Sequence, residues 1–176
     1  MLYPSQTARL ALREWREEDQ PAFAAINADE RVMEFFPAPL TDAESQALMG
    51  RIRDEFSTEG FGAYAVERLS DGELLGFAGL HRVTYSGGME GQVEILWRLR
   101  QDAWGQGYAT EAARACIEHA AKLGIPELIA FTYVGNQRSL NVMKKLGMEC
   151  IGEFDHPGLP EGHPLRRHAL YFIRTE

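Results

Sequence analysis

Cysteine is scarce in this sequence, and its histidines are scattered. Cys116 and Cys150 are the two cysteines among 176 residues and lie far apart, which argues against a disulfide framework or a zinc site. We expect both to be small core residues rather than nucleophiles. The five histidines lack the spacing of metal ligands, so we predict no metal. These features indicate a reducing, cytoplasmic setting.

Long apolar runs and excess positive charge are also lacking. No stretch is apolar for long enough to span a bilayer, and the N-terminus lacks the basic start and apolar run of a signal peptide. Lys and Arg number 18 against 26 Asp and Glu, a net charge of −8. That charge opposes non-specific nucleic-acid binding and favours cationic partners such as amines. We therefore predict neither a nucleic-acid nor a membrane partner.

The composition is otherwise that of an ordinary globular protein, 45% hydrophobic and 25% charged. We find no repeat, low-complexity tract or linker, so a single domain over residues 1–176 is predicted. The sequence leaves the oligomeric state open, a homodimer included.

The first half of the chain changes from helical to strand periodicity. Thr41 and Glu44 have the spacing of a capping box, Gly60 is a suitable helix stop, and Asp71-Gly72 is a hairpin turn signal. Gly76 and Gly79 indicate bulges or close backbone approach. The elements expected are a strand at 10–13, a helix at 17–26, a proline-rich loop at 35–39, a helix at 41–59, strands at 64–66 and 74–80, and a loop at 86–88.

The second half alternates strands with helices. A helix after Gly107 carries small apolar residues at i, i+3, i+4, i+7, i+8 and i+11, so it can approach a sheet closely. It connects two apolar strands, the arrangement of a crossover between parallel strands. The expected strands are 92–99, 128–134, 149–154 and 167–173, with a last helix that has Ser139 in its first turn and ends at Lys145-Leu146-Gly147. The fold class predicted is α/β with a mixed sheet.

Gly105 and Gly107 form a Gly-x-Gly turn between a strand and a helix. Backbone N–H groups there, together with a helix N-terminus, can bind phosphate. A tight turn that simply needs glycine explains the pattern about as well. A Rossmann-type nucleotide site is a further alternative, although the unit sits late in the chain. The Gly-Lys-Ser/Thr of a Walker loop is absent.

The run Trp104-Gly105-Gln106-Gly107-Tyr108-Ala109, with Asn136-x-x-Ser139 and Lys145-Leu146-Gly147 after it, resembles the GNAT superfamily of acetyl-CoA-dependent N-acetyltransferases, and its RimJ/RimL-type branch in particular. The family's pyrophosphate loop reads Gln/Arg-x-x-Gly-x-Gly/Ala. Trp104 departs from its first position, which fits the aromatic-Gly-x-Gly-Tyr-Ala run of that branch but removes one side-chain donor. The resemblance extends in outline from residue 10 to residue 171 and is least specific in the N-terminal third.

This resemblance implies a GNAT-like single domain, with a mixed, mostly antiparallel sheet of about seven strands, flanking helices, and a parallel pair splayed around acetyl-CoA. It implies that strand backbone binds the pantetheine arm and that loop amides bind the pyrophosphate. Arg100 and Arg138 are the candidates for binding the phosphates of the cofactor. The implied cofactor-binding residues are Trp97, Arg98, Leu99, Arg100, Trp104, Gly105, Gln106, Gly107, Tyr108, Ala109, Asn136, Arg138 and Ser139.

Glu94 stands inside an otherwise apolar strand, where a carboxylate is costly to bury without a function. We assign it as the general base, acting directly or through a water. The alternative is a carboxylate on the solvent face of the strand, paired with a cation such as Arg82. His81, Glu34 or an ordered water chain would be the next candidates for the base.

Ser139 is assigned as the general acid by family analogy. Its alternative is a serine that caps the helix backbone, and Asn136 has the same alternative. Tyr171 is a second candidate for the acid, although a strand tyrosine more often packs. No covalent acyl-enzyme is needed for direct transfer in a ternary complex.

The function expected is transfer of an acetyl group to a primary amine, and a protein or peptide N-terminal α-amine is favoured as the acceptor. The alternatives are a small-molecule amine (a polyamine, an aminoglycoside or an amino acid), a non-catalytic CoA-binding module, or a Rossmann-like nucleotide enzyme. Residues 31–40 and 155–166 are irregular, so we expect them to line the acceptor pocket.

Overall fold

The computed structural model describes residue 4 and residues 6–85 and 88–175. The strands are β1 (Leu10–Arg13), β2 (Ala63–Arg68), β3 (Leu74–Arg82), β4 (Val93–Leu99), β5 (Glu127–Tyr133), β6 (Glu149–Asp155) and β7 (Arg167–Arg174). They form one sheet in the order β1-β2-β3-β4-β5-β7-β6. All neighbours are antiparallel except β4 and β5, which are parallel. The predicted mixed, mostly antiparallel sheet is confirmed.

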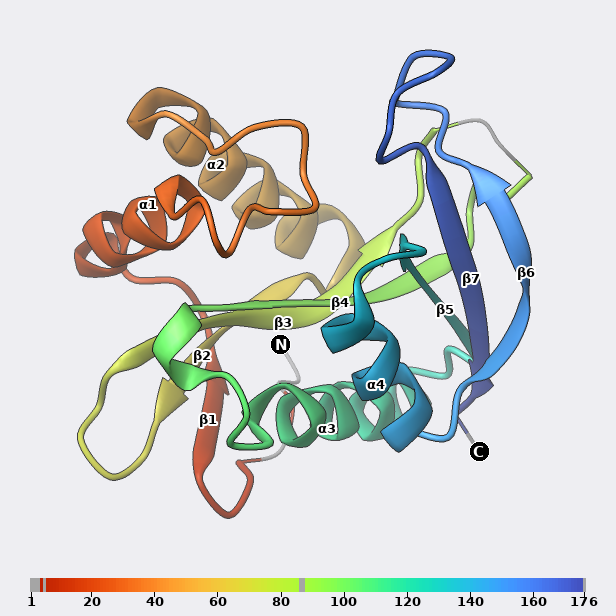
Figure 1. Cartoon of the computed structure of the whole chain (residues 1–176). Helices are drawn as coiled ribbons and strands as arrows, with labels where there is room; N and C mark the ends of the chain where they lie inside the picture. The colour runs from red at the N-terminus through yellow and green to blue at the C-terminus, as the bar shows by residue number, and fades with distance from the viewer. Residues whose placement is uncertain (1–3, 5, 86–87, 176) are drawn as a thin grey trace.

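Helices cover both faces of the sheet. They are α1 (Gln20–Ala28), α2 (Asp42–Glu59), α3 (Tyr108–Lys122) and α4 (Gln137–Lys145), with short 3-10 turns η1 (Glu17–Asp19) and η2 (Gln101–Ala103). Figure 1 shows α1 and α2 over one face and α3 on the other, with α4 near β5. Since α3 connects β4 to β5, these three elements form the crossover that the sequence predicts.

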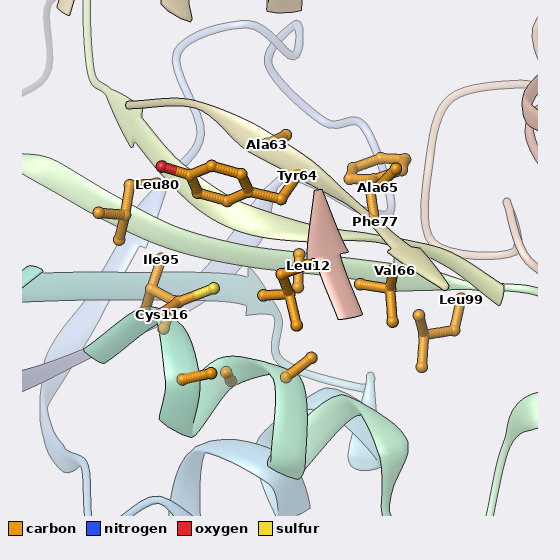
Figure 2. Packing of buried hydrophobic residues seen from close by; sticks show 14 of the residues in the cluster. Leu12, Ala63, Tyr64, Ala65, Val66, Phe77, Leu80, Ile95, Leu99 and Cys116 are labelled. Carbon is orange, nitrogen blue, oxygen red and sulfur yellow. The ribbon is translucent and has the colours of Figure 1, made fainter. Parts of the chain in front are cut away.

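The face of α3 that meets the sheet consists of small residues. Ala112, Cys116 and Ala120 are completely buried and share one helix face by their four-residue spacing. Figure 2 shows Leu99 and Ile95 of β4 on the side of the sheet that faces this helix. Small side chains let α3 lie close to β3 and β4, which places its N-terminus beside the end of β4.

Sequence signals locate both ends of α2. The hydroxyl of Thr41 accepts a hydrogen bond from the N–H of Glu44 at 3.3 Å, and the Glu44 carboxylate accepts one from the N–H of Thr41 at 2.8 Å. Gly60 ends the helix with φ +77°, in the left-handed region. The predicted capping box and glycine stop are both confirmed.

The helix predicted over residues 17–26 divides into η1 and α1. Asp19 accepts a hydrogen bond from the N–H of Arg16 at 2.7 Å and forms an ion pair with Arg13 at 2.7 Å. These contacts hold the first turn in 3-10 geometry, and α1 begins at Gln20, with Pro21 in its first turn.

Two glycines allow β3 to approach its neighbours closely. A Cβ atom on Gly79 would stand 2.1 Å from the carbonyl oxygen of Gly62, and one on Gly76 would stand 2.2 Å from that of Arg98. The close approach predicted at both glycines is confirmed, and at Gly76 it fixes the backbone of β4 next to Arg98.

Other expectations have mixed outcomes. Cys116 is buried as expected, but Cys150 is exposed, because it lies on the edge strand β6, where most side chains are exposed. The loop predicted at residues 86–88 lies partly outside the described residues. In the part of the chain that the structure describes, no helix is both long and apolar enough to cross a membrane. The same residues include no cluster of His, Cys, Asp and Glu arranged as metal ligands.

Candidate active site

The parallel strands β4 and β5 separate soon after they meet. Their pairing has one register pair, Glu94 with Ile129, although β4 continues to Leu99 and β5 to Tyr133. Facing backbone N–H and C=O groups beyond that pair have no strand partner and need another one. A cavity of about 580 Å³ occupies this gap, which we call the β4–β5 wedge.

The turn after β4 suits a phosphate group. Gly105 and Gly107 have φ +74° and +83°, and a Cβ on Gly105 would meet no atom within 4 Å. The first N–H groups of α3 have no acceptor within the helix. Gly107 is the N-cap and offers no side chain to bind them. Free N–H groups and the positive end of the helix dipole at one place fit the pyrophosphate of a nucleotide cofactor.

Side chains from outside the turn hold it in place. The indole Nε1 of Trp104 donates to the carbonyl oxygen of Leu99 at 2.9 Å, so the residue that departs from the family pattern joins the turn to β4. Arg9 donates to the carbonyl oxygen of Gln106 at 2.9 Å and forms an ion pair with Glu111 at 2.6 Å. Sequence reasoning did not find Arg9, because its partners lie about 100 residues further along the chain.

Of the thirteen residues expected to bind the cofactor, Arg100 and Gln106 do not line the cavity. Arg100 forms ion pairs with Asp102 at 2.5 Å and Glu73 at 2.8 Å. The side chain of Gln106 donates to the carbonyl oxygen of Asp102 at 2.8 Å. Both side chains therefore have partners on the far side of the turn, and only the backbone of Gln106 remains near the phosphate position.

Arg138 does line the cavity, but it has a protein partner. It forms an ion pair with Glu34 at 2.5 Å and lies over the ring of Trp104, with its guanidinium carbon 4.4 Å from the ring centroid. Both members of the ion pair are about half exposed, so a phosphate could displace Glu34 at small cost. Glu34, a reserve candidate for the base, is engaged in this contact.

Asn136 and Ser139 stand together at the start of α4. The amide oxygen of Asn136 accepts a hydrogen bond from the N–H of Ser139 at 3.2 Å, so Asn136 is the N-cap. Its amide nitrogen donates to the hydroxyl oxygen of Ser139 at 3.3 Å and to Thr132 at 3.0 Å. Since the capping is done by Asn136, the hydroxyl proton of Ser139 is available to another group in the cavity.

Glu94 lies on the cavity wall without a hydrogen-bond or ion-pair partner among the described residues. Burial raises the pKa of its carboxyl to about 8, Glu55 acts in the same direction, and His81 opposes them. The alternative pairing with Arg82 does not form, because Arg82 pairs with Glu59 at 2.6 Å. A carboxyl with this pKa can accept a proton near neutral pH.

Two titratable side chains, His81 and Glu55, act on the carboxyl of Glu94. His81 is directly opposite Glu94 across β3 and β4, so their side chains share one face of the sheet. The Nδ1 of His81 lies 2.7 Å from Glu55, and this contact raises the pKa of the imidazole. His81 is therefore placed to influence the charge of Glu94, but it does not itself line the cavity.

Ring side chains form much of the remaining wall, and two of them, Phe131 and His168, lie outside the segments that the sequence predicts for the acceptor pocket. Phe131, His156 and His168 line the cavity and lie close together, with the two imidazole centroids 4.9 Å apart. Burial lowers the pKa of both imidazoles. Strand alternation could have placed Phe131 on one face of β5, but it does not show which face meets the cavity.

The two irregular segments expected near the acceptor both reach the cavity. Residues 32–37 contribute aromatic side chains from the α1–α2 connection, and residues 156–159 contribute from the β6–β7 loop. Tyr171, the second candidate for the acid, instead belongs to the buried core and does not line the cavity. Of the residues that the sequence assigned as acid or base, Glu94 and Ser139 are therefore the two that line the wedge.

Comparison with known proteins agrees with this geometry. The model of the family described as "Acetyltransferase (GNAT) domain" matches residues 9–149, more than half of the chain. The chain is 29% identical over 172 residues to the protein named uncharacterized N-acetyltransferase YnaD of Bacillus subtilis, covering 97% of this chain and 96% of that protein. It is 30% identical to an L-methionine sulfoximine/L-methionine sulfone acetyltransferase of Pseudomonas aeruginosa, over 58% of this chain and 61% of that protein.

Among solved structures, the fold is similar to that of RimL, a ribosomal L7/L12 alpha-N-protein acetyltransferase. The TM-score is 0.79 at 17% identity, over 97% of this chain and 93% of that chain. At this identity the likeness shows a common fold. It leaves the RimJ/RimL-type branch that the sequence suggests as a prediction.

Proposed function

The chain belongs to the GNAT family of acetyltransferases and is an N-acetyltransferase that uses acetyl-CoA, and we propose that it acetylates a primary α-amine by direct transfer in a ternary complex. The observation that carries this proposal is the meeting of Glu94, Ser139 and the Gly105–Ala109 turn in one cavity. The cytoplasmic location remains a prediction, and the oligomeric state stays open.

Binding of acetyl-CoA in this proposal uses backbone more than side chains. The free edge of β4 from Trp97 to Leu99 binds the pantetheine arm, as a further strand would. The N–H groups of the turn and of the first residues of α3 bind the pyrophosphate. Asn136 and Arg138 contribute side chains from α4. When bound, acetyl-CoA supplies the thioester carbonyl that the amine attacks.

Glu94 takes the proton that the acceptor must lose. A peptide α-amine has a pKa of about 8 and a lysine amine about 10.4. The pKa of about 8 for Glu94 lies nearer to that of an α-amine than to that of a lysine amine, so an α-amine loses its proton to this carboxylate at less cost. This match favours an α-amine over a lysine or polyamine side chain.

Ser139 supplies a proton at the other end of the reaction. The amine nitrogen forms a bond to the acetyl carbon, the bond from that carbon to sulfur breaks, and the sulfur leaves with the electron pair. The ammonium first gives one proton to Glu94, which releases it to solvent, and after the attack Glu94 takes the second proton from nitrogen. The hydroxyl of Ser139 donates its proton to the thiolate and is then reprotonated from solvent, so that one proton is released in each turnover. No acyl group is attached to the protein at any stage.

We expect Ser139→Ala to lower kcat by about ten- to hundredfold at unchanged acetyl-CoA affinity. The effect lies at the lower end for an acid–base group because a thiol pKa of about 8.5 lets sulfur leave without full protonation. Steady-state kinetics and calorimetry measure the two quantities. Because Asn136 provides the helix cap, the melting temperature should change little. A loss of stability that matches the loss of activity would instead assign Ser139 a structural role.

The proposal as a whole is tested by thiol release from acetyl-CoA over an amine library. The library contains peptides, free amino acids, polyamines and an aminoglycoside, and free thiol is measured with a chromogenic disulfide. Release that depends on an α-amine supports the proposal. Acetyl-CoA binding without release for any amine would contradict it and favour the CoA-binding module.

A further inference from the structure

Arg98 is a half-buried cation that faces the β4–β5 wedge. It lies on β4 two residues beyond Leu96 and four beyond Glu94, so the three side chains project from the same face of the strand. All three line the cavity. The guanidinium carbon lies 4.3 Å from the ring centroid of Phe36 and 5.1 Å from that of Phe77. The side chain is therefore held in one position between two aromatic rings.

The charge of Arg98 has no counter-ion among the residues that the structure describes. Among the described residues no carboxylate lies within ion-pair distance of it. Arg13, another arginine with a mostly buried side chain, pairs with Asp19 at 2.7 Å and Glu67 at 2.6 Å. The protein has eight more acidic than basic residues, yet none of those in the described part of the chain pairs with Arg98. Burial, with no acid to oppose it, lowers the pKa of Arg98 to about 10.

Hydrogen-bond donors exceed acceptors around this guanidinium. Its Nη1 donates to the amide oxygen of Asn27, a fully buried residue of α1, at 2.6 Å. The Nε of Arg98 and the amide nitrogen of Asn27 are buried donors without a partner. Unsatisfied donors beside an unpaired positive charge are unfavourable unless an anion with several acceptor atoms binds there. A carboxylate has that charge and those acceptors.

We propose, on the basis of the acetyl transfer proposed above, that Arg98 binds the carboxylate of the acceptor, which is a small amine with a carboxylate near its amino group, such as a free α-amino acid. Leu96 lies between Glu94 and Arg98 on the strand, and its Cα atom is about 6.6 Å from the Cα atom of each. The side chains of Glu94 and Arg98 are long, so the distance between the carboxylate and the guanidinium can be shorter than the distance between the two Cα atoms. That gap suits a small molecule.

This assignment separates two classes of acceptor. A peptide or protein N-terminus has an uncharged carbonyl next to its α-amine, which would leave Arg98 without a counter-ion. A free amino acid supplies the charge. Phe36, Phe131 and Leu159 give the cavity apolar walls, so an amino acid with an apolar side chain fits better than one with a charged side chain.

The first test uses the wild-type enzyme and changes the acceptor. L-Leucine, L-methionine and L-phenylalanine are each compared with their amides, their decarboxylated amines and a dipeptide amide with the same first residue. The expected result is a kcat/KM for the free acid at least about tenfold higher than for its amide. The amides have the lower amine pKa and thus more neutral amine, so reactivity alone predicts the opposite order.

The second test changes the protein. Arg98→Gln should remove the preference for the free acid, whereas Arg98→Lys, which keeps the charge without the two-pronged geometry, should keep part of it. Arg174→Gln makes the same charge change on an exposed side chain outside the cavity and should change nothing. Calorimetry with acetyl-CoA and melting temperatures show whether each variant is folded. A loss of acetyl-CoA affinity in Arg98→Gln would assign Arg98 to the cofactor and overturn the proposal.

Binding separates failure of this inference from failure of acetyl transfer. Calorimetry with CoA-loaded protein measures affinity for L-leucine and for its amide without any reaction. If no amine releases thiol but wild type binds L-leucine and Arg98→Gln does not, the carboxylate site is supported and acetyl transfer is contradicted. If peptides and amides release thiol from acetyl-CoA as readily as free acids do, acetyl transfer is supported and the carboxylate site is contradicted.

Discussion

Glu94→Gln is expected to lower kcat/KM at pH 8.5 by roughly two to four orders of magnitude, the usual contribution of a general base. Acetyl-CoA affinity should be retained, because the proposed contacts of the pantetheine arm come from the backbone of β4. In wild type, kcat/KM should rise with pH through the ionisation of a group with a pKa of about 8. The ionisation of the enzyme should be absent in the variant, in which only the ionisation of the amine acceptor remains, and rates from pH 6 to 9.5 with acceptors of different amine pKa separate the two.

His81→Gln tests the same assignment from the opposite strand. Protonated His81 lowers the pKa of Glu94, so its removal should move the rise in rate to higher pH without abolishing it. Wild-type rates in Glu94→Gln across the whole pH range would show that the base lies elsewhere.

Stability provides a readout of Glu94 that does not depend on activity. In the folded protein the carboxyl keeps its proton up to about pH 8, whereas its ordinary pKa is 4.5. Between these pH values the folded state binds more protons than the unfolded state, so this residue lowers stability as the pH rises. Glutamine cannot ionise. We therefore expect Glu94→Gln to melt above wild type at pH 9 and close to it at pH 4.5.

Local pattern was enough to predict much of the fold. The capping box at Thr41, the stop at Gly60 and the small-residue face of α3 depend on spacings of three or four residues, which the sequence displays directly. The parallel pair followed from the strand–helix–strand order. The splaying of that pair came only from the family resemblance, because no property of β4 or β5 alone requires them to separate.

Long-range contacts account for what the sequence did not predict. Arg98 was expected to contribute backbone to the cofactor, and nothing near it in the chain indicates that Asn27, 71 residues away, would receive its side chain. Arg100 was expected to meet phosphate, but Asp102 and Glu73 hold it elsewhere. A sequence shows which residues are charged, whereas the direction of each charge depends on partners that the fold brings near.

Gly107→Val is expected to weaken acetyl-CoA binding by at least about 100-fold. Gly107 has φ +83°, a conformation that a β-branched residue rarely adopts. Space in the protein is not the obstacle, since a Cβ there would meet only the guanidinium of Arg9, at 3.4 Å. The turn would have to relax and rotate its N–H groups away from the pyrophosphate. Loss of two hydrogen bonds to a charged group, at about 1.5–3 kcal/mol each, gives this factor.

Gly72→Val is the matched control. Gly72 has φ +74° with no atom within 4 Å of a Cβ, and it lies in the β2–β3 hairpin, away from the cavity. Both variants carry the same kind of backbone strain, so their melting temperatures should fall by similar amounts. Only Gly107→Val should lose affinity when acetyl-CoA is titrated in a calorimeter. Equal loss in both variants would attribute the effect to general destabilisation, and full affinity in Gly107→Val would remove the turn from the phosphate site.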